Sequence, residues 1–271
     1  MAHWTEELFK EHPELFLGAF EVRLEQSYDE VAGLLNCLAE QGFQPKRVLD
    51  LNCGIGRHSV EIAKKGTKVV GTDLSPDYIK IAGERAAAEG VARKATFKVA
   101  DMRRIAEALS AEKPFDGIVC LWTSFGFYDE ETNIDVLKQC LGLVKRGGFL
   151  ALDIVNRDWL VQNFQEQGFT RWNERLVLEE RQFNPADSHI YNTWTFLKKQ
   201  DGDTYKLEKS VKLNHRVWSL HELVALIEKA GWKYRSAYPG FFPGGIGEGD
   251  GLTPQAEEIL QSRMLLVIGC R

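Results

Sequence analysis

The chain has 271 residues, 44% of them hydrophobic and 27% charged, which suits a globular α/β domain that carries an insertion. Its formal net charge of −5 argues against a nucleic-acid partner, because such partners normally meet a basic face. No secretory signal or membrane-spanning apolar stretch is visible, and the five cysteines lack metal-ligand spacing. We therefore expect a cytoplasmic protein with reduced thiols, no metal and no membrane partner.

Residues 1–44 have helical periodicity, and Val31, Leu34 and Leu38 fall on one stripe. From residue 45 onward, short apolar runs alternate with helical patterns. Such alternation predicts right-handed βαβ crossovers and a mainly parallel sheet with helices on both faces. The predicted strands are 46–51, 68–73, 95–100, 115–121 and 149–155, and the predicted helices are 57–65, 76–89 and 129–145, the last ending at a Gly147-Gly148 stop signal.

The pattern changes in residues 158–218, where aromatic and β-branched residues alternate and turn residues separate the runs. Strands are predicted at 175–183, 189–197 and 204–218, which indicates an antiparallel meander inserted into the α/β domain. Ser219 and Glu222 then form a capping box for a helix that runs to Ala230. Two further strands are predicted at 232–238 and 264–270, on either side of a glycine-rich loop.

A glycine turn and two acids mark the first two strands of the predicted sheet. Asp50 lies at the end of the first strand, Gly54 and Gly56 follow in a turn, and Asp73 ends the second strand. Glycines allow backbone N–H groups to approach a ligand closely, and a helix N-terminus then faces its polar end. An acid at the tip of the next strand can accept both hydroxyls of a ribose. The pattern therefore predicts an adenosine-containing cofactor.

A third acid favours S-adenosylmethionine over a nicotinamide cofactor. The nicotinamide fingerprint requires a third glycine, but Ser59 stands at that position. Asp101 and Met102 follow the third strand, where a carboxylate can accept from the adenine amino group. An NAD-dependent oxidoreductase remains an alternative, as does a non-catalytic protein that binds S-adenosylmethionine.

The chain resembles the class I S-adenosylmethionine-dependent methyltransferases over nearly its whole length. More narrowly, it is similar to a small cytosolic prokaryotic group whose substrates are largely uncharacterised. The motifs that carry this resemblance are Cys53-Gly54-x-Gly56-Arg57-His58, Asp101-Met102-Arg103, Trp122-Thr123-Ser124-Phe125-Gly126-Phe127, Asp153 with Asn156-Arg157, and His215-Arg216-Val217-Trp218-Ser219.

The resemblance implies a fold, a domain division and a reaction. It implies a Rossmann-like, seven-stranded and mostly parallel sheet, with an antiparallel last strand and a cap made by the meander. We expect an N-terminal helical lid segment at 1–44, a core at 45–157 and 219–271, and the cap at 158–218. The N-terminal segment, the meander and the loop at 240–251 together would close over the site.

The expected cofactor contacts belong to the strand tips and the glycine turn. Asn52 takes the position where the family usually has the first glycine, so its backbone must adopt the angles of the turn. Arg23 and Tyr28 are expected near the cofactor carboxylate. The full set of cofactor residues is Arg23, Asp50, Asn52, Cys53, Gly54, Gly56, Asp73, Leu74, Asp101, Met102, Leu121 and Trp122.

The candidate substrate contacts are Tyr28, Phe125, His215, Arg216 and Tyr238. Each also has a structural reading, such as an ion pair for Arg216 or a solvated strand face for His215. The meander aromatics suit an apolar, aromatic or cationic acceptor, or simply the buried face of a small sheet.

No residue pair points to a particular acid–base assignment, so the catalytic residues stay open. We expect methyl transfer to nitrogen or oxygen of a small molecule by direct in-line displacement, with S-adenosylhomocysteine as the product. The acidic charge and the cap disfavour RNA or protein acceptors. A monomer or a homodimer is expected.

Overall fold

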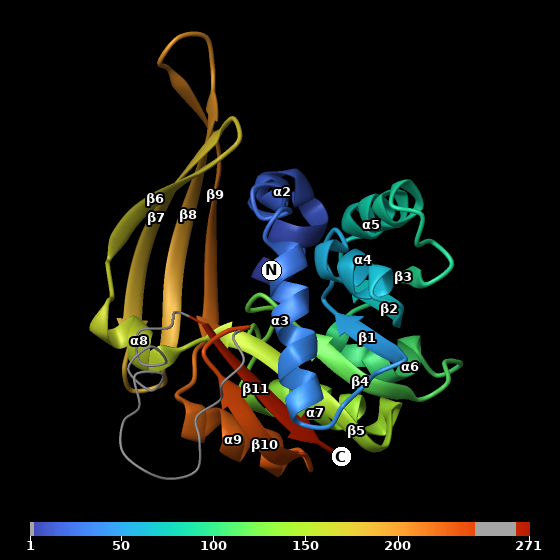
Figure 1. The fold of residues 1–271 in the computed structure, drawn as a ribbon. Coiled ribbons are helices and arrows are strands. Elements are labelled where there is room, and N and C mark those ends of the chain that lie inside the picture. Colours follow the sequence, from blue (N-terminus) through green and yellow to red (C-terminus); the bar gives the residue numbers. More distant parts are fainter. Residues whose placement is uncertain (1–2, 242–263) are drawn as a thin grey trace.

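Two β-sheets of different kinds organise the computed structural model, which describes residues 3–241 and 264–271 (Figure 1). The larger sheet has the strand order β10-β11-β5-β4-β1-β2-β3, and β11 is antiparallel to both of its neighbours. The other pairings within this sheet are parallel, so the predicted fold class is confirmed. Its strands are β1 (Arg47–Leu51), β2 (Lys68–Asp73), β3 (Ala95–Val99), β4 (Phe115–Cys120), β5 (Val144–Val155), β10 (Lys233–Tyr238) and β11 (Met264–Cys270).

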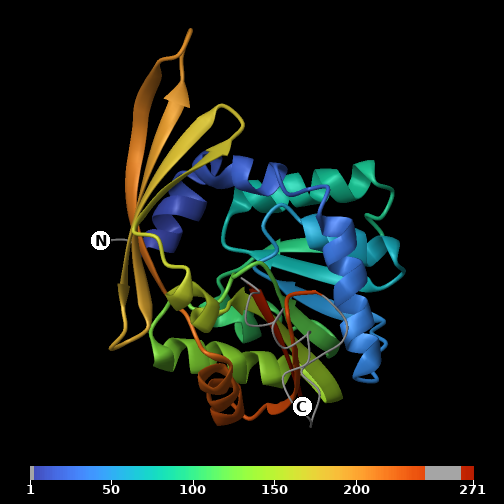
Figure 2. The ribbon, with the colours of Figure 1, turned by 60° about the vertical axis from the view of Figure 1, so that its left-hand side comes forward.

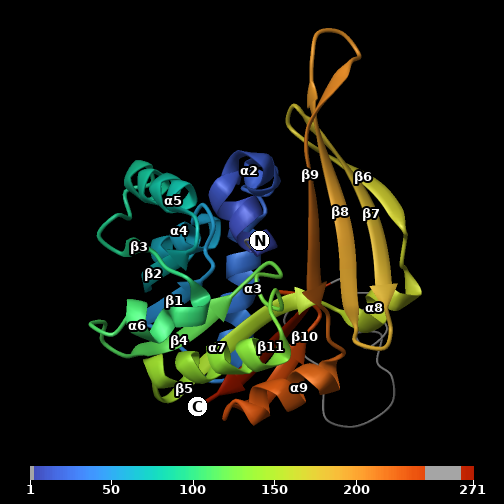
Figure 3. The same ribbon diagram turned by 180° about the vertical axis from the view of Figure 1, so that it is seen from behind.

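Helices cover both faces of this sheet and form two hydrophobic clusters with it (Figures 1 and 3). One face packs against α3 (Ser27–Glu40), α4 (Arg57–Lys64) and α5 (Pro76–Ala88). The other face carries η2 (Met102–Arg104), α6 (Ile105–Ala108), α7 (Glu130–Leu143) and α9 (Leu220–Lys229). None of the helices within residues 3–241 and 264–271 has the length and hydropathy needed to cross a membrane.

The second sheet is an antiparallel meander in the order β6-β7-β8-β9, which rises beside the larger sheet (Figure 1). We call it the cap sheet. It lies within residues 158–218, the range predicted for the insertion, and follows the short helix α8 (Arg157–Gln162). Its strands are β6 (Gln167–Trp172), β7 (Arg175–Asn184), β8 (His189–Lys199) and β9 (Tyr205–Arg216).

The N-terminal segment connects the cap sheet to the core. It comprises α1 (Trp4–Glu6), the π-helix η1 (Glu7–Glu11), α2 (Pro13–Glu21) and α3. Trp4, Leu8 and Leu15 share a hydrophobic cluster with residues of the cap sheet, such as Trp172 and Val177. Figure 2 shows the first of these helices, up to α2, beside the cap sheet and between it and α5, whereas α3 lies farther from the cap sheet, against the core.

Two local predictions were wrong. The strand β6 was missed, because only six residues alternate there and Phe169 on this edge strand is 72% exposed. The helix predicted to end at Gly147-Gly148 ends at Leu143 instead. Gly147 has a φ of 74° and lies inside β5, whose first residue, Val144, already pairs with Phe115. The glycine therefore adjusts the strand rather than stopping the helix.

Gly117 lies in the central strand β4, where an added methyl group has no room. A Cβ atom at this position would lie 2.3 Å from the ring of Phe149. We expect Gly117→Ala to lower the free energy of unfolding by about 1–3 kcal/mol, measured by urea denaturation. Gly83 is the matched control, because a Cβ atom there in α5 meets nothing within 4 Å. Gly83→Ala should stabilise the helix by up to about 1 kcal/mol. Equal stability of the two variants would contradict this packing argument.

Candidate functional site

A cavity of about 1070 Å³ lies at the carboxyl ends of the central strands. The N-terminal helices, the strand tips, α8 and the inner face of the cap sheet all contribute to its wall. Ligands of open parallel sheets bind at this end of the strands, and drug-sized ligands occupy about 300–1,000 Å³. The cavity therefore has room for a nucleoside-sized ligand and a second small molecule.

The glycine turn between β1 and α4 adopts left-handed backbone angles. Gly54 has a φ of 54°, Gly56 a φ of 72° and Asn52 a φ of 59°. A Cβ atom at Gly54 would lie 2.7 Å from the ring of Phe20. Asn52 thus adopts the left-handed conformation expected at its position in the turn, which asparagine tolerates better than most residues. Its side-chain amide donates to the Ser124 carbonyl at 2.8 Å and so ties the turn to the loop after β4.

Asp50 supports the turn from below. It is 1% exposed, does not line the cavity, and accepts a hydrogen bond from the Ser59 hydroxyl at 2.5 Å. Burial raises its pKa to about 7.

Asp73 instead lines the cavity at the tip of β2. Its two oxygens accept from the backbone N–H groups of Gly54 and Ser75, both at 2.9 Å. Burial raises the pKa of this carboxyl group to about 6, and the backbone hydrogen bonds oppose that shift. Asp73 is therefore a carboxylate at the cavity wall that the backbone holds in place beside the turn.

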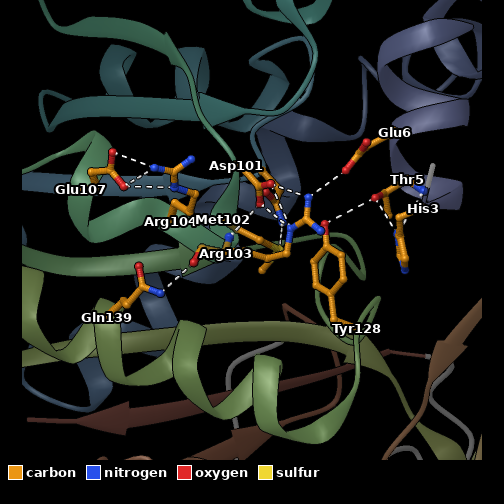
Figure 4. A network of polar contacts seen from close by, with 11 residues as sticks. His3, Thr5, Glu6, Asp101, Met102, Arg103, Arg104, Glu107, Tyr128 and Gln139 are labelled. Carbon is orange, nitrogen blue, oxygen red and sulfur yellow. Dashed lines mark hydrogen bonds and ion pairs between the residues drawn. The ribbon is translucent and has the colours of Figure 1, made fainter. Parts of the chain in front are cut away.

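The third acid, Asp101, is engaged by its neighbour. It accepts from the backbone N–H of Arg103 at 2.8 Å and pairs with the Arg103 guanidinium at 2.5 Å. Arg103 also reaches Glu6 at 2.9 Å and lies over the Tyr128 ring (Figure 4). Burial alone would raise the pKa of Asp101, but the hydrogen bonds from Arg103 hold it below its usual value. The contact between Asp101 and adenine stays a prediction, and the Asp101 carboxylate that would make it is already paired with Arg103.

The loop after β4 is held in an uncommon conformation by Asp153. Trp122 and Thr123 have φ values of 54° and 57°, which cost about 1–3 kcal/mol each in residues other than glycine. The Asp153 carboxylate accepts from the Trp122 N–H at 2.8 Å, and its carbonyl accepts from the Thr123 N–H at 2.9 Å. Its other carboxylate oxygen, Oδ1, is buried without a hydrogen-bond partner among the described residues, although Asp153 lines the cavity. Burial raises the pKa of Asp153 to about 7.

A buried charge cluster lies behind Trp122. Arg57, 2% exposed, pairs with Glu30, which also bonds to His58 Nε2 at 2.8 Å. The guanidinium of Arg57 lies 5.1 Å from the Trp122 ring centroid, and that of Arg23 lies 5.4 Å from it. Burial would raise the pKa of Glu30, but His58 and Arg57 hold it below its usual value. The cluster thus joins α3 of the N-terminal segment to the first turn of α4.

Eight of the predicted site residues line the cavity together. The structure thus brings the tips of β1, β2 and β4, the start of η2, the N-terminal segment and the cap sheet to one space. These residues are Arg23, Asn52, Asp73, Leu74, Asp101, Met102, Trp122 and His215.

The other predicted cofactor residues lie outside the cavity lining. Cys53, Gly54, Gly56 and Leu121 do not line the cavity in this structure, nor does Asp50. Cys53 and Leu121 are 7% and 3% exposed, so their side chains belong to the packing beneath the turn and the β4 loop.

Four predicted substrate contacts lie outside the cavity, each for a local reason. Tyr28 is 54% exposed on α3. Phe125 packs on Trp218, with ring centroids 5.4 Å apart. Arg216 pairs with Glu222 at 3.2 Å. Tyr238 is 1% exposed; its hydroxyl accepts from Gln41 at 2.8 Å and donates to the Cys37 carbonyl. The predicted lid loop at 240–251 lies outside the described residues from position 242 onward.

Other lining residues were not singled out as site residues from the sequence. In the sequence, Asp153 was named only as part of a motif. It lies near the carboxyl end of β5, however, and an acid at a strand end is the signal that identified Asp73 on β2. Phe16 and Phe20 lie one helical turn apart on α2 and both face the cavity. Glu179 and Asn192 lie on the inner face of the cap sheet, a face that the period of two could have identified once β6–β9 were known.

Comparison with known proteins agrees with the fold. Residues 48–148 match the family profile described as "Methyltransferase domain". A ubiquinone biosynthesis O-methyltransferase from Leptothrix cholodnii is 33% identical over 114 residues, which cover 41% of this chain and 45% of that protein. The chain thus spans less than half the length of this curated relative.

Solved structures match over a larger share of the chain. An S-adenosylmethionine-dependent methyltransferase from Clostridium acetobutylicum has a TM-score of 0.71 at 17% identity, covering 90% of this chain and 91% of that one. CalS10, an amino pentose methyltransferase from Micromonospora echinaspora solved with S-adenosylmethionine bound, has a TM-score of 0.64 at 18% identity, covering 90% and 92%. At these identities the likeness shows the fold.

Proposed function

We propose that this chain, whose residues 48–148 match the methyltransferase domain profile, transfers a methyl group from S-adenosylmethionine to a small-molecule acceptor. The observation that carries this proposal is Asp73, a carboxylate at a strand tip, at the wall of the cavity and beside the glycine turn. The acceptor atom is a nitrogen or an oxygen, and S-adenosylhomocysteine is the product. The motifs quoted above support membership of the narrower prokaryotic group.

The residues present fit this cofactor. Asp73 would hold the ribose hydroxyls, since a carboxylate oxygen can accept more than one hydrogen bond. Asp101 and Met102 would border the adenine, and Arg23 would meet the carboxylate of the amino-acid end. Gly54 and Gly56 allow Phe20, Ala82 and Phe97 to pack closely against the turn, since a Cβ atom at either glycine would collide with them. No group of three or more potential metal-ligating side chains occurs in the part of the chain that the structure describes, and the proposed reaction requires none.

When bound, the cofactor supplies an electrophilic methyl group on a positively charged sulfur. The chain's own contribution is mainly to hold the acceptor in line with that methyl group and to exclude water. The aromatic side chains of Phe16, Phe20 and Trp122 form an apolar wall for this purpose. Where the acceptor carries a proton at neutral pH, the free Oδ1 of Asp153 would accept it, because its pKa of about 7 suits a general base.

A small acceptor is favoured by the enclosing walls of the cavity, formed by the N-terminal segment and the cap sheet. We propose that residues 1–44 and 158–218 act together as a lid over the core. Two of the similar proteins, an O-methyltransferase of ubiquinone biosynthesis and an amino pentose methyltransferase, are named for small acceptors. No nucleic acid is expected as a partner, and a monomer or a homodimer remains the prediction for assembly.

Calorimetry tests the proposal directly. The protein should bind S-adenosylhomocysteine and should not bind NAD, which is the cofactor of the competing oxidoreductase. Methyl-labelled S-adenosylmethionine is then incubated with protein and a pool of small metabolites. Label recovered in a small molecule supports an enzyme, whereas cofactor binding without transfer to any acceptor would favour a non-catalytic binding protein. Binding of NAD alone would refute the proposal.

The pH dependence of cofactor binding should follow Asp73. Ribose hydroxyls donate to the ionised carboxylate, and its pKa in the folded protein is about 6. Affinity for S-adenosylhomocysteine should therefore be constant above pH 7 and should fall by up to about tenfold per pH unit below pH 6. Asp50, with a pKa of about 7, titrates nearby, so calorimetry between pH 5 and 8 is repeated on Asp50→Asn. A profile that loses its slope in this variant would assign the effect to Asp50 instead.

A further inference from the structure

The inner face of the cap sheet presents polar side chains among aromatic ones. Every second residue of β8, such as Asn192, has its side chain on this face. The residues paired with it on β7 and β9, Arg181 and Leu213, have their side chains on the same face. The side chains of this face that line the cavity are Glu179, Arg181, Ile190, Asn192, Trp194, Leu213 and His215.

Two polar atoms on this face have no partner. Asn192 Oδ1 and Trp194 Nε1 are both buried, and neither forms a hydrogen bond within the described part of the chain. Asn192 is 6% exposed. Leaving a buried polar group unpaired costs about 1–3 kcal/mol, so an unexplained pair of this kind calls for a ligand. One atom needs a donor and the other needs an acceptor, and hydroxyl groups supply both functions.

The face carries no uncompensated charge. Glu179 is paired with Arg181, and it also accepts from the Thr170 hydroxyl at 2.7 Å. Burial, assisted by the charge of His189, lowers the pKa of His215 to about 4, so its imidazole is neutral at pH 7. An ammonium or phosphate group placed here would find no free counter-charge. The part of the ligand that contacts this face is therefore neutral.

Aromatic rings give this face flat walls. Trp172 meets Trp194 edge-on, with ring centroids 5.7 Å apart. Trp159 of α8 and Phe164, which follows α8, also line the cavity. Phe16 stacks on Trp194 at 5.7 Å and also lies 5.7 Å from Trp122. A planar or chair-shaped ring packs well against such walls. Through Phe16, this face is connected to the β4 loop, where we place the methyl transfer.

We infer that the inner face of the cap sheet is the acceptor subsite and that it takes a neutral ring bearing hydroxyl groups. Asn192 Oδ1 accepts from one hydroxyl, the Trp194 N–H donates to an oxygen of the same ring, and the ring packs on the aromatic walls. The inference rests on the proposed function for its role in methyl transfer, while binding of the ring can be measured independently.

Matched pairs of rings test this chemistry. The probes are catechol against 1,2-dimethoxybenzene, and cis-cyclohexane-1,2-diol against cis-1,2-dimethoxycyclohexane. The ether of each pair keeps the ring and both oxygens but replaces the two hydroxyl donors by methoxy groups. NMR titration of protein saturated with S-adenosylhomocysteine should give at least about tenfold tighter binding of at least one diol than of its ether. Asn192→Leu and Trp194→Phe keep the bulk of each side chain. Asn192→Leu removes the acceptor for the hydroxyl and should reduce that preference, whereas Trp194→Phe removes a donor to an oxygen that diol and ether both carry and should weaken the binding of both. Tyr191→Phe is the control, since Tyr191 is 42% exposed on the opposite face of the same strand.

Each outcome of these titrations either supports or contradicts the acceptor subsite. Equal binding of diol and ether, a preference that survives Asn192→Leu, unchanged affinities in Trp194→Phe, or no binding of either diol would overturn the subsite. A preference shown only by the aromatic or only by the alicyclic diol supports the subsite and identifies the kind of ring. The same titration without S-adenosylhomocysteine separates the two proposals, because ring binding by a protein that does not bind the nucleoside would refute the function and leave the subsite standing.

Discussion

Asp73→Asn is expected to weaken S-adenosylhomocysteine binding by about 100-fold, because charge-assisted hydrogen bonds to two ribose hydroxyls are lost. The substitution keeps the size of the side chain and one acceptor oxygen. That oxygen can still accept from Gly54 or Ser75, whose N–H groups lie 2.9 Å from the native carboxylate. The fold should therefore survive better than in an alanine variant, which would leave both N–H groups buried without partners. Calorimetry at pH 8 measures the affinity, and urea denaturation measures the stability.

Asp50→Asn is the matched control for this result. Asp50 is a neighbouring buried carboxylate, and it bonds to Ser59 rather than facing the cavity. Its replacement should change stability more than affinity. If both variants bind S-adenosylhomocysteine as tightly as the native protein does, the nucleoside does not rest on the tip of β2, and the proposed function loses its main support.

Much of the fold followed from local signals that act over a few residues. Ser75 directly precedes the helix predicted at 76–89, and its side chain caps that helix by accepting from the Tyr78 N–H at 3.3 Å. The capping box of Ser219 and Glu222 is likewise present. Signals of this kind depend on backbone groups within one helical turn, so the sequence alone is sufficient to read them. The end of α7 was misjudged because Gly147 serves equally well as a helix stop or a strand irregularity.

The site was predictable to the extent that it depends on topology. In a parallel sheet, the carboxyl ends of neighbouring strands share one edge, so Asp73 and Asp101 had to lie near each other. The partners of these acids were not predictable. Arg103 holds Asp101 with help from Glu6, which is 97 residues away in the chain. Likewise, the positive φ angles of Trp122 and Thr123 depend on Asp153, which lies on a different strand.

For the cap sheet, the sequence alone did not give the pairing of the strands, which decides the face on which each side chain lies. Alternation predicted that one face of the meander is buried, but two assignments of faces remained possible until the strands were paired. Pairing of Arg181 with Asn192, and of Asn192 with Leu213, puts these residues on the cavity side. Arg216, one position beyond His215, consequently belongs to the other face, where it meets Glu222.

The N-terminal segment contributes much of the cavity wall, and one buried cluster fastens it to the core. Glu30 on α3 receives both Arg57 and His58 from the first turn of α4. Arg57 is 2% exposed, and its Nη2 has no partner among the described residues, so it depends strongly on this one carboxylate. Loss of the Glu30 charge would leave a cation buried without compensation, which is among the more costly changes a folded protein can undergo.

Glu30→Gln is therefore expected to lower the free energy of unfolding by about 3 kcal/mol, since the cost of breaking a buried pair is about 3–5 kcal/mol and Glu30 keeps some solvent contact. Urea denaturation measures this loss, and limited proteolysis should show faster cleavage within residues 1–44. Glu84→Gln is the control, because Glu84 faces Lys80 at 3.9 Å on the exposed side of α5 and should be neutral. Adding Arg57→Met to Glu30→Gln removes the stranded cation and should restore most of the stability. If the double variant is no more stable than Glu30→Gln alone, desolvation of Arg57 is not what makes Glu30 necessary, and the attachment of the lid segment must rest on the apolar contacts of α3.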